Sequence, residues 1–370
     1  MIFAQRRNCT LTPVLVLLLA AIGLGGCASL EYYGQAVRGH WGVMAARRPI
    51  ADVLADPATP APLRHKLALA RAARDFASDQ LTLPRNASYT VYTALDRRYV
   101  VWNVFAAPRL SLELKESCFL VVGCLGYRGY FSEPAARSAA AALRRDGYDV
   151  YVGGVAAYST LGWFADPLLS SMLHWEDAVL VKTLFHELAH QRLYVPDDAT
   201  FNESFATAVA EAGYARWREE TAEGAGLPAH VSRDAEFIAL VMRHRQALAA
   251  LYESPGPATE KLAAKAVQLA RLREEFAALG ANWPDRADYA RWLARDLNNA
   301  KLASVGTYHT HVPGFTALLV RRDGDFPRFF AAVDRLADLP RASRDACLEA
   351  LAAGPAHVPG PCGNVLGAPE

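Results

Sequence analysis

The sequence HELAH at residues 186–190 is the feature that most constrains this 370-residue chain, because its chemistry requires a helix. Residues four apart lie on one helical face, so the imidazoles of His186 and His190 can reach a single metal ion. Glu187 lies about 100° further around, where its carboxylate can accept a proton from water without being a ligand. Neutral imidazoles suit Zn²⁺, which in hydrolytic sites has three protein ligands and one open position. Chance gives about 0.01 such matches in a chain of this composition, so we interpret HELAH as a zinc-binding motif.

The third zinc ligand must come from another segment, and two glutamates are candidates. We favour Glu203, because a turn over residues 195–198 can fold its helix back against His190, with Asn202 as the N-cap of that helix. Glu211 is the alternative, two turns further along and on nearly the same face. Only one of the two is expected to reach the ion, and the other can orient a histidine through its second ring nitrogen.

Residues around the motif also resemble a known class of enzymes. HELAHQ followed by FNESFA at residues 201–206 resembles the gluzincin metallopeptidases, which take a ligand from a Glu on the next helix. Together with AYSTLGWFADP at 157–167 and the leader described below, the chain looks most similar to a bacterial family of aminopeptidase lipoproteins. The resemblance covers most of the mature chain and implies a zinc peptidase that acts on peptide substrates. The distance in sequence from His190 to Glu203 is shorter than in thermolysin-like gluzincins, whereas Glu211 is nearer their spacing.

The segment 153–166 is expected to form one wall of the substrate cleft by strand-like pairing with the substrate backbone. Tyr158, Ser159 and Thr160 are candidate polar contacts there. A structured loop that only closes the core is an almost equal alternative. Tyr158 and Tyr308 are candidate donors to the oxyanion, because a tyrosine hydroxyl stays neutral at pH 7. His309 and His311 would share one face of a strand. A lone HxH pair is weak evidence for a metal site, so we interpret this segment as a loop or as polar groups on the substrate side.

The amino terminus has the pattern of a bacterial lipoprotein leader. Arg6 and Arg7 precede an apolar run over residues 11–24, and Leu-Gly-Gly-Cys at 24–27 resembles a lipobox. This resemblance implies a signal peptide at residues 1–26 and a lipid anchor at Cys27, which attaches the chain to the membrane. By the same resemblance, Ala28 favours the periplasmic face of the outer membrane. The alternative is a plain signal peptide or a short anchor.

The net charge limits the class of partner that the chain can bind, and the cysteine content indicates the redox state of its compartment. The chain has 39 Lys and Arg against 38 Asp and Glu, so no nucleic-acid partner is expected. Four cysteines remain after the leader and Cys27, and an oxidising periplasm favours disulfides. Short separations favour the pairs Cys118–Cys124 and Cys347–Cys362, among three possible connectivities.

Hydrophobic periodicity predicts an α+β fold that is predominantly α, with a small mixed sheet followed by the HELAH helix and a helical lobe. We predict a helical segment at 27–88, a metallopeptidase core at 89–225 and a C-terminal helical lobe at 226–370. The predicted helices from residue 134 onward are 134–146, 176–194, 202–222, 232–252, 259–280, 286–303, 313–322, 326–337 and 341–352.

Three functions remain open at this point. The first is an aminopeptidase, which must bind a free α-ammonium group; Asp166 and Glu211 are the acids available for that purpose. The second is a zinc endopeptidase that acts on envelope proteins or peptidoglycan peptides. The third is a non-enzymatic envelope scaffold, against which the intact Glu187 argues, since a scaffold has no use for a general base.

Overall fold

The computed structural model describes residues 32–119, 123–157, 159–227, 231–354 and 362–363. The predicted leader, Cys27 and Tyr158 therefore lie outside the described residues. The fold is predominantly helical with small sheets of two or three strands, which confirms the predicted α+β class. No helix within the described residues is long and apolar enough to cross a membrane.

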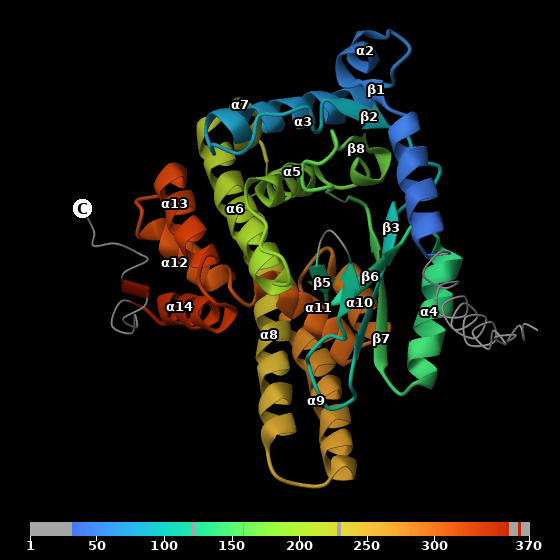
Figure 1. Cartoon of the computed structure of the whole chain (residues 1–370), viewed down its shortest axis with the longest axis vertical. Helices are drawn as coiled ribbons and strands as arrows, with labels where there is room; N and C mark the ends of the chain where they lie inside the picture. The colour runs from blue at the N-terminus through green and yellow to red at the C-terminus, as the bar shows by residue number, and fades with distance from the viewer. Residues whose placement is uncertain (1–31, 120–122, 158, 228–230, 355–361, 364–370) are drawn as a thin grey trace, which may run out of the picture.

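A three-stranded antiparallel sheet forms one side of the molecule, with strand order β6-β3-β7 (Figure 1). Its strands are β3 (Val101–Ala107), β6 (Tyr127–Tyr130) and β7 (Asp149–Val155). One face packs on α4 (Glu133–Arg145) through Trp102, Val104 and Val150. The opposite face, which carries Phe105, is turned toward the helices of the candidate site. The alternation of the apolar residues along β3 thus separates two layers.

Two smaller sheets complete the β structure. Strands β1 (Arg48–Pro49), β2 (Val91–Thr93) and β8 (Leu168–Leu169) form one, followed by the 3₁₀ turn η1 (Ser170–Met172). Strands β4 (Ser117–Phe119) and β5 (Gly123–Leu125) form a separate hairpin.

The central helix pair is α5 (Asp177–Arg192) and α6 (Ala199–Glu220), which pack against each other, with α5 beneath α3 (Ala61–Asp79) (Figure 1). Phe185 of α5 is fully buried and contacts the rings of Phe76 and Trp217. Gly213 allows this close packing, because a Cβ there would lie 2.6 Å from Leu81 Cδ1. Burial on this scale makes α5 a rigid support for the histidines that it carries.

The amino-terminal part is helical, as its periodicity predicts. Residues 32–45 form a helix, followed by α2 (Ile50–Ala55) and α3.

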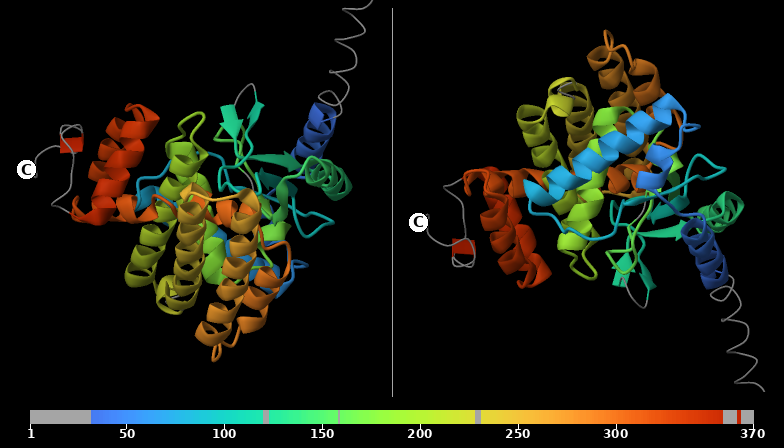
Figure 2. Two further views of the ribbon diagram at one scale, coloured as in Figure 1. Left: turned by 90° about the horizontal axis from the view of Figure 1, so that it is seen from below. Right: turned by 90° about the horizontal axis from the view of Figure 1, so that it is seen from above.

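Beyond α6 the chain is almost wholly helical, as predicted. A long hairpin of α8 and α9 extends from the body and shares a second apolar core with α10 and α11. Helices α12, α13 and α14 pack on the other side of α6 (Figures 1 and 2). The helices after α6 are α7 (Ala222–Ala225), α8 (Val231–Glu253), α9 (Ala258–Leu279), α10 (Arg286–Ala294), α11 (Asn299–His309), α12 (Val312–Val320), α13 (Phe326–Ala337) and α14 (Arg341–Ala353).

Two predictions for this region are wrong. The single helix predicted at 286–303 is divided into α10 and α11, because Asn298 caps a new helix by accepting from the Lys301 N–H. The next side chain, Asn299, donates to the carbonyls of Pro108, Arg109 and Ser111, which ties α11 to the loop after β3. The strand predicted for His309 and His311 is absent: His309 ends α11, and His311 precedes α12.

Candidate metal centre

Three potential metal ligands converge between α5 and α6. Nε2 of His186 lies 3.1 Å from Nε2 of His190 and 3.1 Å from Oε2 of Glu203. The third side of the triangle, from His190 to Glu203, is 3.4 Å. Ligands bound to tetrahedral zinc at 2.0–2.1 Å are separated by about 3.3–3.4 Å. The donor set and its spacing therefore fit a zinc ion, and of the two candidate glutamates the structure brings Glu203 to the histidines.

The turn between the helices determines this geometry. Asp198 caps α6 by accepting from the Phe201 N–H at 3.1 Å, so the helix begins at Ala199. The prediction that Asn202 is the cap is therefore wrong. Asn202 lies inside the first turn, where its side chain accepts from the Val195 N–H at 2.8 Å and donates to the Val195 carbonyl at 2.7 Å. These two bonds hold the turn against α6 and place Glu203 over His190.

The pKa values of Glu203 and His190 are shifted by the charges of the neighbouring potential ligands. Burial alone would raise the pKa of Glu203, but the adjacent His190 and His186 outweigh it and lower that pKa. Burial alone would lower the pKa of His190, yet the Glu203 carboxylate raises it overall. A carboxylate that stays ionised beside two imidazoles is a pattern suited to a cation. Nδ1 of His190 has no hydrogen-bond partner among the described residues.

Glu187 faces a cavity of about 760 Å³ that also contains the three ligands. Burial raises the pKa of Glu187, against the opposing influence of His186 and His190. A carboxylate with a raised pKa is a stronger proton acceptor than an ordinary surface glutamate, as a general base requires. The cavity is lined by the helix at 32–45, strands of the main sheet, Ala157, residues 159–164, α5, α6 and α11.

Three tyrosines border the ligand group. The ring of Tyr308, on α11, stacks on His186 with centroids 6.1 Å apart. The Glu203 charge raises the pKa of its hydroxyl, and burial adds to this, so Tyr308 remains a neutral donor. Tyr127 on β6 and Tyr194 after α5 also line the cavity; burial raises the pKa of both, that of Tyr194 to about 12.

Sequence reasoning found Tyr308 but missed the other two. Tyr194 follows His190 by four residues, so the helical period could have suggested it. Tyr127 lies on a short strand 59 residues before His186, and nothing in the sequence connects the two.

Residues 31–348 of the chain match the family described as putative aminopeptidase. The chain belongs to this putative aminopeptidase family. The matched region contains HELAH, Glu203 and the three tyrosines, so family membership supports a peptidase-type hydrolase. Comparisons with curated proteins and with solved structures gave no match.

Asp166 stabilises the segment 153–166, which was predicted to form a wall of the substrate cleft. Its carboxylate accepts from the Thr160 N–H at 3.0 Å, from the Thr160 hydroxyl at 2.7 Å and from the Ser159 hydroxyl at 3.3 Å. Gln191 of α5 donates to it as well. Asp166 is buried and does not line the cavity, so the prediction that it contacts substrate gives way to a role in shaping the loop.

Ser159 and Thr160 line the cavity, and their hydroxyls donate to Asp166. Glu211 is exposed on α6 and belongs neither to the ligand group nor to the cavity lining.

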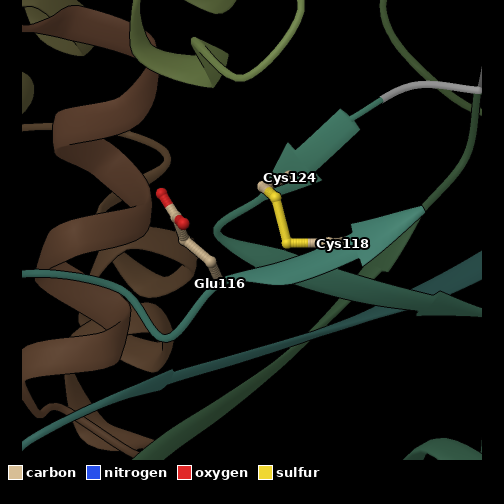
Figure 3. A group of neighbouring side chains, drawn as sticks. All are labelled: Glu116, Cys118 and Cys124. Carbon is tan, nitrogen blue, oxygen red and sulfur yellow. A yellow bond between two sulfur atoms is a disulfide. The ribbon is translucent and has the colours of Figure 1, made fainter. Parts of the chain in front are cut away.

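Both predicted cysteine pairs are bonded in the structure, Cys118 to Cys124 and Cys347 to Cys362. Figure 3 shows Glu116 beside the first disulfide, a cluster whose residue types alone would suit a metal. Because the two sulfurs are bonded to each other, they offer no thiolate ligand. The hairpin that they close is docked on the α5–α6 turn, where Asp197 accepts from the Cys124 N–H at 2.6 Å.

Proposed function

We propose that this protein is a zinc-dependent peptidase, with His186, His190 and Glu203 as ligands and Glu187 as general base. The observation that carries the proposal is the triangle of 3.1, 3.1 and 3.4 Å between the three donor atoms, with Glu187 in the same cavity. Family membership supplies the peptide substrate class, and the intact general base argues against a scaffold without activity.

Zinc, when bound, would polarise the scissile carbonyl and acidify water. Glu187 accepts the proton of the attacking water and passes it to the leaving amine. Tyr308, held neutral beside Glu203, donates a hydrogen bond to the developing oxyanion.

The family description favours removal of single amino-terminal residues, and this is the form of the proposal that the sequence resemblance also suggests. An endopeptidase is the second candidate, favoured by one observation. Neither Asp166 nor Glu211 lines the cavity, and the carboxylates among its described lining residues are Glu187 and Glu203 alone. A free α-ammonium group would therefore find no additional acid there.

The proposal also locates the enzyme in the bacterial envelope, tethered at Cys27 on the periplasmic face of the outer membrane. The helix that follows exposes Tyr33, Val37 and Trp41 on one face, four residues apart. Exposed Tyr and Trp side chains suit the interface between lipid and water. Val37 and Trp41 also line the cavity. Labelling with an alkyne fatty acid tests the tether, since a Cys27→Ser variant should take up no label.

Metal analysis of the purified full chain tests the zinc chemistry. We expect about one zinc per chain. Hydrolysis of a peptide mixture should stop after treatment with 1,10-phenanthroline and return when zinc is added. Unchanged hydrolysis by metal-free protein would contradict the proposal.

A further inference from the structure

Asn103, in the middle of β3, is a polar residue that the proposed mechanism does not use. It lines the cavity, yet only 7% of its surface is exposed. No hydrogen bond of its side-chain amide is found within the described part of the chain. Neither of its polar atoms is among the side-chain atoms shielded from solvent without a partner, so the amide is open to the cavity. An amide that faces a largely apolar cavity without a protein partner is available to form hydrogen bonds with a ligand there.

The neighbours of Asn103 leave a depression in the sheet. Paired residues of antiparallel strands point to the same face, and Asn103 pairs with Gly129 on β6 and with Gly153 on β7. This row therefore has an amide at its centre and no side chain on either side. The rows before and after it carry large side chains: Val101, Val155, Phe105, Tyr127 and Tyr151.

The depression is open on the side of Gly129. A Cβ on Gly129 would lie 3.1 Å from Asn103 Oδ1 and 3.1 Å from Val101 Cγ1, so any side chain there would cover the amide. On the other side the ring of Tyr151 already leans over Gly153, with its Cε1 only 3.2 Å from the position of a Cβ. Accordingly Gly129 lines the cavity, and Gly153 does not.

The depression is close to the reacting groups. Tyr127, which borders the ligand group, is two residues from Gly129 on the same strand, or about 7 Å along β6. A peptide that crosses the cavity in an extended conformation would cover this distance with about two residues.

The surroundings of the depression are apolar. Val101, Phe131, Val155 and Ala157 line this part of the cavity. No Asp, Lys or Arg is found among the described lining residues. A charged side chain placed here would lose its hydration without gaining a partner of opposite charge.

We propose that the depression over Asn103 is a substrate subsite for an uncharged, apolar residue of a peptide, whose backbone amide pairs with the Asn103 side chain. An asparagine amide has one acceptor and a donor group, as a peptide unit does, so the match is complementary. The apolar walls take up the side chain of that residue. The proposal rests on the proposed peptidase function and names its preferred substrate.

Binding is tested apart from hydrolysis with the zinc-loaded Glu187→Gln variant. The probes are alanine hexapeptides with acetylated and amidated ends, in which one Leu, Phe, Lys or Asp is moved along the chain. Calorimetry should show one position at which Leu or Phe binds at least about ten-fold tighter than Lys or Asp.

Two further substitutions in the Glu187→Gln background locate the preference. Gly129→Val should weaken binding of the best peptide about ten-fold, whereas the matched control Gly226→Val, which meets nothing within 4 Å, should not change it. Asn103→Asp is nearly isosteric and adds a negative charge, so the preference at that position should move from Leu toward Lys.

The outcomes separate the two proposals. Equal affinities for all residues, no measurable binding, or a preference that survives both Gly129→Val and Asn103→Asp would overturn the subsite. If wild-type protein hydrolyses none of the peptides but Glu187→Gln binds them with the expected preference, the subsite stands and the peptidase proposal fails.

Discussion

Oε2 of Glu203 lies 3.1 Å from Nε2 of His186, although the two residues are 17 positions apart and belong to different helices. The contact is made by the short turn between α5 and α6, and Asp198 begins the second helix early enough for Glu203 to face the first. Glu211, two turns further along α6, is carried out to the exposed surface. One helix thus presents two similar glutamates to quite different surroundings.

Replacement of Glu203 by Ala should remove most of the bound zinc, because one of three protein ligands is lost. We expect the affinity for zinc to fall by more than about ten-fold. Loss of a residue that only orients a metal ligand already costs about that much, and Glu203 is a ligand itself. Competition with a chromogenic chelator measures the change. Glu211→Ala is the matched control and should retain the metal; a reversed result would assign the third ligand to Glu211.

Glu187→Gln should keep both the fold and the zinc while losing hydrolysis, since only the proton-accepting group is altered. Loss of a general base reduces kcat by about 10²–10⁴. Steady-state kinetics on zinc-loaded protein provides the measurement. Activity equal to wild type would remove Glu187 from the mechanism.

Tyr308→Phe should lower kcat by about 10²-fold with little change in KM, because an oxyanion donor acts mainly in the transition state. Zinc content should stay the same. Tyr289→Phe, beside the core of α8, α9 and α10, is the control for loss of a hydrogen-bonded tyrosine hydroxyl far from the ligand group. If Tyr308→Phe is fully active, Tyr127→Phe and Tyr194→Phe are the next variants to measure.

A peptide with a free amino terminus and its acetylated form should distinguish the two modes of cleavage. Acetylation removes the positive charge that an aminopeptidase must bind. The family description predicts that acetylation stops cleavage, whereas equal cleavage of both forms would establish an endopeptidase. Mass spectrometry of the products identifies the bond that is broken.

Cys118 and Cys124 should be oxidised to each other in protein isolated from the envelope. Their disulfide closes the hairpin that docks on Asp197 at the turn before Glu203. Alkylation without reduction, followed by peptide mass spectrometry, should find no labelled thiol at either position. Two labelled cysteines would show that the hairpin is held by packing and hydrogen bonds alone.

The parts of the fold that could be predicted from the sequence are those governed by local periodicity. The helix around HELAH was predicted at 176–194 and is found at Asp177–Arg192, because its apolar residues repeat at helical spacing. The break before α11 could not be predicted. Asn298 caps the new helix, and Asn299 fixes its position by donating to carbonyls about 190 residues away in sequence.

In the candidate site, too, only the residues that follow a local sequence pattern could be predicted. His186, Glu187 and His190 follow from a spacing of four residues on one helix. Asp166 was predicted to contact substrate, because the sequence does not show that its carboxylate accepts hydrogen bonds from Ser159 and Thr160. Asn103 gave no signal at all, since its importance arises only when Gly129 is placed beside it on another strand.

The paired hydrogen bonds of Asn202 to Val195 have a consequence for how the protein would respond to its surroundings. They hold the turn after α5 against α6 through protein groups, and the Arg192–Asp334 and Arg344–Asp198 ion pairs fasten both ends of the turn to the C-terminal helices. The chain should therefore survive periods of metal starvation in folded form. Recovery would then require only uptake of zinc and no new protein synthesis, so the supply of metal would determine how many molecules are active.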